Sequence, residues 1–137
     1  MSLKLQRIAY CSDATRPDLA IQTLAEILAV SDRNNVRDNL TGVLLISKGR
    51  FFQVLEGAQQ DVDRALRRIE ADGRHTNLRL VARQDVATRL FGQWGMVAAR
   101  ISPSRQPQID RVIDHCHADP AAAVDTARAL LDRQIAA

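Results

Sequence analysis

The feature that most constrains the fold is a pair of apolar segments joined by a two-residue turn in the first half of the chain. Residues 39–47 carry a nearly continuous apolar run, which is typical of a strand with both faces buried. Lys48 and Gly49 follow, and residues 51–55 then read Phe-Phe-Gln-Val-Leu. Two strand patterns this close together predict a β-hairpin, so the two strands must be antiparallel neighbours in one sheet.

Strand and helix patterns flank this hairpin in a regular order. Residues 3–11 predict a first strand and residues 18–35 a helix, whereas residues 59–71 predict a second helix. Two more strands are expected at 77–84 and 91–99. The order βαββαββ predicts an α+β fold, a ferredoxin-like sandwich with a five-stranded sheet and two helices on one face.

The end of the chain predicts two more helices. Residues 102–107 are rich in Pro and Ser and predict a short hinge, and amphipathic helices are expected at about 107–117 and 120–135. Because two helices on one face leave the other face of the sheet open, this tail is expected to cover that face or to contact a partner. We therefore divide one compact unit into residues 1–101 and a helical extension at 102–137.

Composition and charge exclude several classes of protein. The 137 residues fit a single domain, and 46% hydrophobic with 26% charged residues is close to the average for globular domains. A net charge of +3 without a clustered basic stripe does not indicate a nucleic-acid partner. The chain shows neither a signal-peptide pattern nor an apolar run near ~18 residues, so we expect a cytoplasmic protein without a membrane partner.

The cysteines show no metal-binding spacing. Cys11 and Cys116 lie far apart, and no CxxC pattern is present. Cys116 lies between His115 and His117 in a predicted helix, where adjacent side chains diverge and cannot easily bind one ion. We therefore expect no metal site.

Two polar side chains lie on otherwise apolar strand faces. Gln53 shares a strand face with Phe51 and Leu55, and Tyr10 shares one with Ser12. A buried amide or phenol needs a hydrogen-bond partner, since an unpaired one costs about 1–3 kcal/mol. The simpler interpretation is a solvated hairpin edge and an ordinary core tyrosine. The alternative is that both residues bind a polar group held in the core.

The two predicted helices carry further candidate residues. Ile27, Ser31 and Asn35 are four residues apart, so they form one stripe along the first helix. Asn34 and Asn35 taken alone indicate only the end of that helix. Ile69 offers a second apolar surface on the second helix.

Charged residues gather at the end of the second helix. They are Arg68, Asp72, Arg74 and His75, which taken alone indicate a solvated helix end. Together with the amides, the phenol and the two isoleucines, they outline a slot between two helices on a sheet. Such a slot fits a planar heteroaromatic ligand with a polar or phosphorylated tail.

Five segments in this order resemble the BLUF family of flavin-binding blue-light sensors. The segments are residues 7–12, 31–42, 49–57, 72–75 and 89–96. The resemblance extends over residues 3–98, and the ordered set is specific although each segment alone is weak. One departure is Gly95, which stands where the family commonly has Ser.

The resemblance implies a light-driven switch that uses FAD, with FMN or riboflavin as alternatives, bound without a covalent bond. Tyr10 would donate an electron and a proton to the excited flavin, and the hydrogen bonds of Gln53 would rearrange. Trp94 and Met96 match the strand that relays the change from Gln53.

The resemblance also implies where the cofactor is held. Asn34 and Asn35 would bind the pyrimidine edge of the ring, and Ile27 and Ile69 would lie on its two sides. The full set of expected cofactor contacts, besides Gln53, is Ile27, Ser31, Asn34, Asn35, Phe51, Leu55, Arg68, Ile69, Asp72, Arg74 and His75.

The leading hypothesis is a photoreceptor that is not an enzyme. It would pass a red-shifted signalling state to a separate output protein and form a homo-oligomer. A flavin-dependent oxidoreductase is one alternative, although no nucleophile–base pair is evident. The other is an RNA-binding module of the same fold, for which exposed aromatics near Phe51 and Phe52 would be needed.

Overall fold

The computed structural model describes residues 4–15, 39–47, 49–73, 75–91, 97–98 and 106–136. The helix predicted at 18–35 lies outside these residues. The described elements are β1 (Leu5–Ala14), β2 (Thr41–Ser47), β3 (Arg50–Ala58), α2 (Gln59–Ala71), β4 (His75–Val86), β5 (Val97–Ala98), α3 (Gln106–His115) and α4 (Pro120–Ala136).

The strands form one five-stranded sheet in the order β4-β1-β3-β2-β5. The predicted hairpin is confirmed, because β2 pairs antiparallel with β3 and Leu44 lies opposite Gln53. β1 pairs antiparallel with both β3 and β4, and β5 joins the far edge parallel to β2. This arrangement confirms the ferredoxin-like prediction. β4 is longer than expected, while residues 92–96 before β5 lie outside the description.

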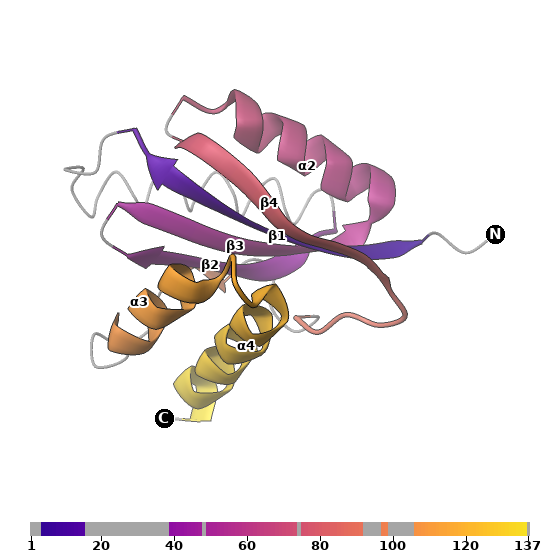
Figure 1. Cartoon of the computed structure of the whole chain (residues 1–137). Helices are drawn as coiled ribbons and strands as arrows, with labels where there is room; N and C mark the ends of the chain where they lie inside the picture. The colour runs from indigo at the N-terminus through magenta and orange to yellow at the C-terminus, as the bar shows by residue number, and fades with distance from the viewer. Residues whose placement is uncertain are drawn as a thin grey trace.

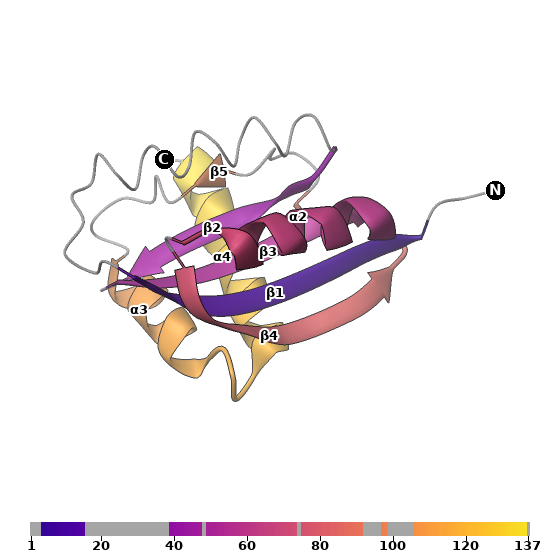
Figure 2. The same ribbon diagram turned by 90° about the horizontal axis from the view of Figure 1, so that it is seen from above.

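Helices cover both faces of the sheet. Figures 1 and 2 show α2 over one face and α3 with α4 over the opposite face. The alternation of β3 explains this arrangement, because Phe51 and Leu55 pack in the same apolar cluster as Val62 of α2. The intervening Phe52 and Val54 pack in a second cluster that includes residues of α3 and α4. Each face of β3 therefore needs its own helical layer.

The second helix begins and ends where the sequence predicts. α2 follows β3 directly, buries Val62 and Ala65 against the sheet, and carries Asp61 in its first turn, where a negative charge favours the helix dipole. At the other end the backbone N–H of Asp72 donates to the carbonyl of Ile69 at 3.1 Å. This bond closes the last turn of α2, and Asp72 follows it in extended backbone.

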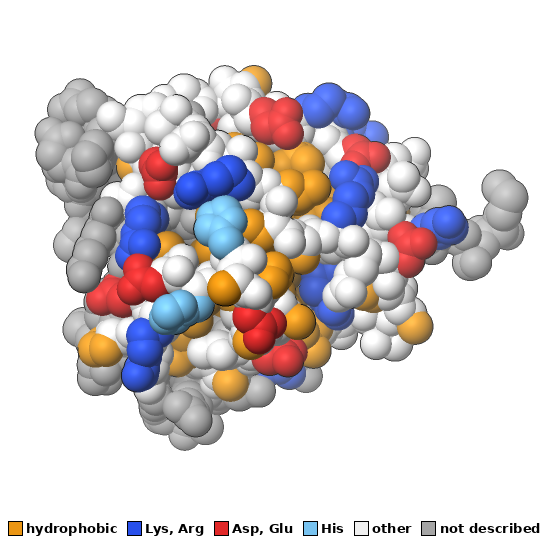
Figure 3. All heavy atoms as spheres, viewed as in Figure 1, with side chains coloured by type: hydrophobic (Ala, Val, Ile, Leu, Met, Phe, Trp, Pro, Cys, Tyr) orange, Lys and Arg blue, Asp and Glu red, His pale blue; other side chains and the backbone are white. Residues whose placement is uncertain are grey.

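Several charged side chains of the described residues form ion pairs across the surface. On the face seen in Figure 3, Lys and Arg side chains alternate with Asp and Glu side chains. Arg50 and Asp114 form an ion pair at 2.7 Å that joins β3 to α3, and Arg83 pairs with Asp63. No helix in the described parts of the chain is long and apolar enough to cross a membrane.

Gly57 lies where β3 has no room for a side chain. A Cβ atom built there would be 2.6 Å from Leu40 Cδ2 and 3.4 Å from the Asn39 carbonyl oxygen. We expect Gly57→Ala to lower the free energy of unfolding by about 1–3 kcal/mol, because the buried Leu40 must shift. Denaturant titration measures the change.

Gly73→Ala is the matched control for this substitution. Nothing lies within 4 Å of a Cβ atom at position 73, so its effect should stay within about 0.5 kcal/mol. Equal losses of stability in both variants would contradict the close packing at Gly57.

Candidate functional site

A hydrogen-bonded phenol and amide lie at the centre of the sheet. Tyr10 of β1 lies directly opposite Gln53 of β3, and both side chains are buried, at 1% and 3% exposure. The Tyr10 hydroxyl donates to Oε1 of Gln53. Gln53 is therefore not on a solvated hairpin edge, and Tyr10 donates to a side chain. The two residues share the sheet face covered by α2, since their neighbours Ile8 and Leu55 pack with that helix.

Burial keeps the phenol of Tyr10 protonated. Desolvation in the sheet, with a smaller contribution from the negative charge of Asp72, raises the pKa of Tyr10 far above its ordinary value of 10.0. A protonated phenol can donate its hydrogen to Gln53 across the physiological pH range. The charge of Asp72 also connects the end of α2 electrostatically with the Tyr10–Gln53 pair.

The structure describes the side chains of five of the thirteen other predicted site residues. Phe51 and Leu55 are buried next to Gln53 along β3, and Ile69 is partly buried against the α2-side core. Arg68 and Asp72 lie at the end of α2 and are partly exposed. Outside the described residues, or with undescribed side chains, are Ile27, Ser31, Asn34, Asn35, Arg74, His75, Trp94 and Met96.

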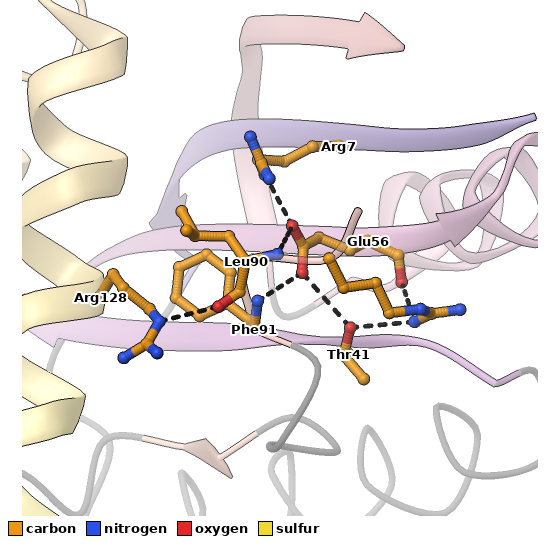
Figure 4. A network of polar contacts seen from close by, with 7 residues as sticks. Arg7, Thr41, Glu56, Leu90, Phe91 and Arg128 are labelled. Atoms are coloured by element: carbon orange, nitrogen blue, oxygen red, sulfur yellow. Dashed lines mark hydrogen bonds and ion pairs between the residues drawn. The ribbon is translucent and has the colours of Figure 1, made fainter. Parts of the chain in front are cut away.

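A buried carboxylate that the sequence reasoning did not single out lies on the opposite face of β3. Glu56 is fully buried, and its Oε2 accepts from Nε of Arg7 at 2.7 Å and from the backbone N–H of Leu90 at 2.8 Å (Figure 4). Its Oε1 accepts from the N–H of Phe91 at 2.7 Å and from the hydroxyl of Thr41 at 3.4 Å. Glu56 therefore joins three segments to its own strand.

Two arginines extend this network. Arg89 Nη1 donates to the Thr41 hydroxyl at 2.9 Å and to the Glu56 carbonyl at 3.1 Å. From α4, Arg128 Nε donates to the Leu90 carbonyl at 2.8 Å (Figure 4). Residues 89–91 are therefore bonded to β2 and β3 on one side and to α4 on the other. This segment leads directly into residues 92–96, which include Trp94 and Met96.

Alternation along β3 could have indicated Glu56. Glu56 follows Phe52 and Val54 on one strand face, so it occupies an apolar stripe just as Gln53 does. The sequence does not reveal its partners, because they come from β1, β2 and a loop more than thirty positions away.

A family model matches most of this chain. A family described as "Sensors of blue-light using FAD" matches residues 5–97. The matched range includes the Tyr10–Gln53 pair and Glu56 with its direct partners, but not Arg128. The chain therefore belongs to the BLUF family of blue-light sensors, which use a flavin.

Individual relatives are light-regulated signalling proteins. Photoactivated adenylate cyclase subunit alpha of Euglena gracilis is 31% identical over 112 residues, which are 80% of this chain and 11% of the relative. The blue light- and temperature-regulated antirepressor BluF of Escherichia coli (strain K12) is 33% identical over 81 residues, 59% of this chain and 20% of the relative. The chain thus spans only a small part of these relatives.

Solved structures show the same fold. A bacterial light-regulated adenylyl cyclase superimposes with a TM-score of 0.72 at 34% identity, covering 83% of this chain and 35% of that one. The dark-state structure of BlrB, a BLUF protein, superimposes with a TM-score of 0.79 at 24% identity, covering 96% and 99%. The second likeness supports the fold alone.

Burial removes the basis for the RNA-binding alternative. Base stacking on a ferredoxin-like sheet requires exposed aromatic side chains on the central strands. Phe51 and Phe52 are 1% and 0% exposed, with α2 covering one face and α3 and α4 the other. These two aromatics therefore cannot stack on a base.

Replacement of the buried carboxylate tests the Glu56 network. We expect Glu56→Gln to lower the free energy of unfolding by about 2–4 kcal/mol, because the amide removes the charge that pairs with Arg7 and places an N–H₂ group among donors. Denaturant titration measures the change. Glu70→Gln, at an exposed position of α2, should change stability by less than about 0.5 kcal/mol. A Glu56→Gln protein as stable as this control would contradict the network.

The raised pKa of Tyr10 predicts a particular response to alkaline pH. Tyr10 is the one tyrosine in the sequence, so ¹³C labelling of the tyrosine ring gives a single phenol resonance. This resonance should stay at its protonated position through about pH 11, where an exposed tyrosine is mostly ionised.

The raised pKa of Tyr10 also predicts how the free energy of unfolding changes at alkaline pH. Above pH 10.0 the unfolded chain loses the phenol proton while the folded chain keeps it, so the free energy of unfolding should fall as pH rises. Tyr10→Phe should show less of this decline. Ionisation of the folded protein near pH 10 would contradict the burial of Tyr10.

Proposed function

We propose that this chain senses blue light with FAD and that the Tyr10–Gln53 pair is its photoactive centre. The buried hydrogen bond from the Tyr10 hydroxyl to Oε1 of Gln53 carries the proposal. It places a proton donor and a reversible donor–acceptor group side by side in a dry part of the sheet.

The chemistry of the pair suits a flavin edge. Gln53 uses its carbonyl oxygen as the acceptor for Tyr10, so its amide N–H₂ group is oriented as a donor. The flavin ring offers carbonyl and imine acceptors to such a donor. When bound and excited by blue light, FAD supplies a strong one-electron oxidant.

The chain's own residues then perform the switch. Tyr10 gives up one electron and its phenolic proton, and the change at its hydroxyl removes the hydrogen bond that held Gln53 in place. Gln53 rotates or changes tautomer, so it presents a different group to the cofactor. Return of the electron and proton to Tyr10 restores the dark state, because no covalent bond has formed.

The remaining contacts follow the expected slot. Asp72 and Arg68 at the end of α2 are proposed to lie toward the polar tail of FAD, with Arg74 and His75. The ring is proposed to lie between Ile27 and Ile69, with Phe51 and Leu55 beneath it. Ser31, Asn34 and Asn35 are proposed to bind its polar edge, and Trp94 and Met96 to relay the change at Gln53.

The chain is proposed to act as a cytoplasmic switch and not as an enzyme. A phenol kept protonated by burial is a poor acid–base catalyst at neutral pH, which disfavours a flavin oxidoreductase. The relatives named above include a cyclase subunit and an antirepressor. We propose a separate output protein as the partner and a homo-oligomer as the assembly, with α3 and α4 as the contact surface.

The decisive experiment is the absorption spectrum of the purified protein before and after blue light. We expect a flavin spectrum that shifts slightly to the red and recovers in darkness. Tyr10→Phe should retain the flavin but lose the shift, because the phenol supplies the electron and proton. A Tyr10→Phe protein with an unchanged shift would overturn the role of Tyr10.

Gln53→Leu tests the amide separately. This variant should also bind flavin without the red shift, because leucine cannot exchange donor for acceptor. Gln59→Leu, at an exposed position of α2, is the matched control and should keep the full shift. A protein that stays photoinert after reconstitution with FAD would overturn the proposal as a whole.

A further inference from the structure

Three metal-binding side chains converge where the sheet meets the end of α3. The ligand atoms of Cys11, Cys116 and His117 all lie within 4.8 Å of one another. Cys11 comes from β1, and Cys116 and His117 from the turn that follows α3. Both cysteines are buried, at 2% and 0% exposure, while His117 is exposed.

The tertiary structure corrects the sequence argument at this point. α3 was expected to continue to residue 117 but ends at His115, so Cys116 and His117 are not in a helix. The third ligand comes from β1, 105 positions away from Cys116 in the sequence. Neither the end of α3 at His115 nor the approach of Cys11 can be predicted from the spacing of residues along the sequence.

We propose that Cys11, Cys116 and His117 form a binding site for a thiophilic cation of the Zn²⁺ type. Two thiolates and one imidazole match the ligand preference of Zn²⁺, and a water molecule would complete a tetrahedral set. The site lies on the sheet face covered by α3 and α4, because Cys11 and Cys116 belong to that apolar cluster. It uses none of the residues proposed to contact the flavin.

The backbone spacing favours a bridging ion over a direct covalent link. The structure joins the two sulfur atoms as a disulfide, but the Cα atoms are 7.6 Å apart. Disulfides usually span about 4.4–6.8 Å between Cα atoms. In the reduced protein, an ion about 2.3 Å from each sulfur would bridge Cys11 and Cys116 over a longer span than a disulfide does.

Burial and access also fit a cation. Cys116 Sγ lies 3.3 Å from the Ile113 carbonyl oxygen, so in the reduced protein its thiol has a weak polar partner within the apolar cluster. Ion binding replaces the two thiol protons, which leave as H⁺, and the positive charge compensates two buried thiolates. Because His117 is exposed, an ion can reach the site from solvent at this side chain.

The consequence is a clamp between β1 and the end of α3. Cys11 directly follows Tyr10 in β1, with its side chain on the opposite face of the sheet. A bound ion would therefore hold the helical layer against the strand that carries Tyr10.

Zinc titration of the full-length, flavin-loaded protein tests the site. The protein is first reduced with a phosphine and freed of metal with a chelator. We expect native mass spectrometry to show one Zn²⁺ bound with the loss of two protons, and the thermal midpoint to rise. With Cd²⁺, an ultraviolet thiolate-to-metal band should appear in the unmodified protein, so the test does not depend on any variant folding.

Variants assign the ligands. Cys116→Ser should weaken Zn²⁺ binding by at least about 100-fold and His117→Gln by at least about tenfold, measured by competition with a chromophoric chelator. His115→Gln is the matched control, since His115 is outside the convergent set, and its affinity should not change. Retained affinity in Cys116→Ser would overturn the proposal.

Two other outcomes would also overturn the proposal. One is a reduced protein that binds no Zn²⁺ or Cd²⁺ at one equivalent. The other is closure of a Cys11–Cys116 disulfide in the presence of Zn²⁺, seen as a mass lower by two hydrogens and the absence of titratable thiols. Either result leaves the flavin spectrum unaffected, so failure here is distinguishable from failure of the photochemical proposal.

Discussion

The arrangement of this protein depends on the hydrogen bonds and the ion pair made by the buried carboxylate of Glu56. A charge removed from water is tolerated only when it is paired and hydrogen-bonded, and Glu56 meets that requirement with partners from β1, β2 and the segment after β4. Each partner must therefore be in place for the fold to be stable. Arg128 adds α4 through the carbonyl of Leu90.

This network lies immediately behind the Tyr10–Gln53 pair, the proposed photoactive centre. Gln53 and Glu56 are three positions apart in β3, so their side chains project from opposite faces of the same strand. One face carries a neutral, rearrangeable hydrogen bond, and the other carries a charged and fully satisfied one. The rigid side holds β3 in register, which keeps Gln53 opposite Tyr10. It also holds residues 90 and 91, which bond to Glu56 and, through the Leu90 carbonyl, to Arg128 of α4.

The local elements were predictable because their signals are local. The hairpin between β2 and β3 follows from a two-residue turn between apolar runs, and α2 follows from apolar spacing that ends at Asp72 and Gly73. The pairing of Tyr10 with Gln53 was only half predictable. Alternation placed each residue on an apolar face, but the hydrogen bond between them depends on the register of β1 against β3.

The sequence by itself determined the order of the described elements, the family, and which polar residues occupy apolar stripes, because these depend on periodicity and on short motifs. Only the tertiary structure decided what those residues touch. Glu56 needs donors from distant segments, and Cys11 meets Cys116 and His117 only after α3 and α4 cover the sheet. Chain spacing carries no information about such contacts, since packing of the two layers brings the groups together.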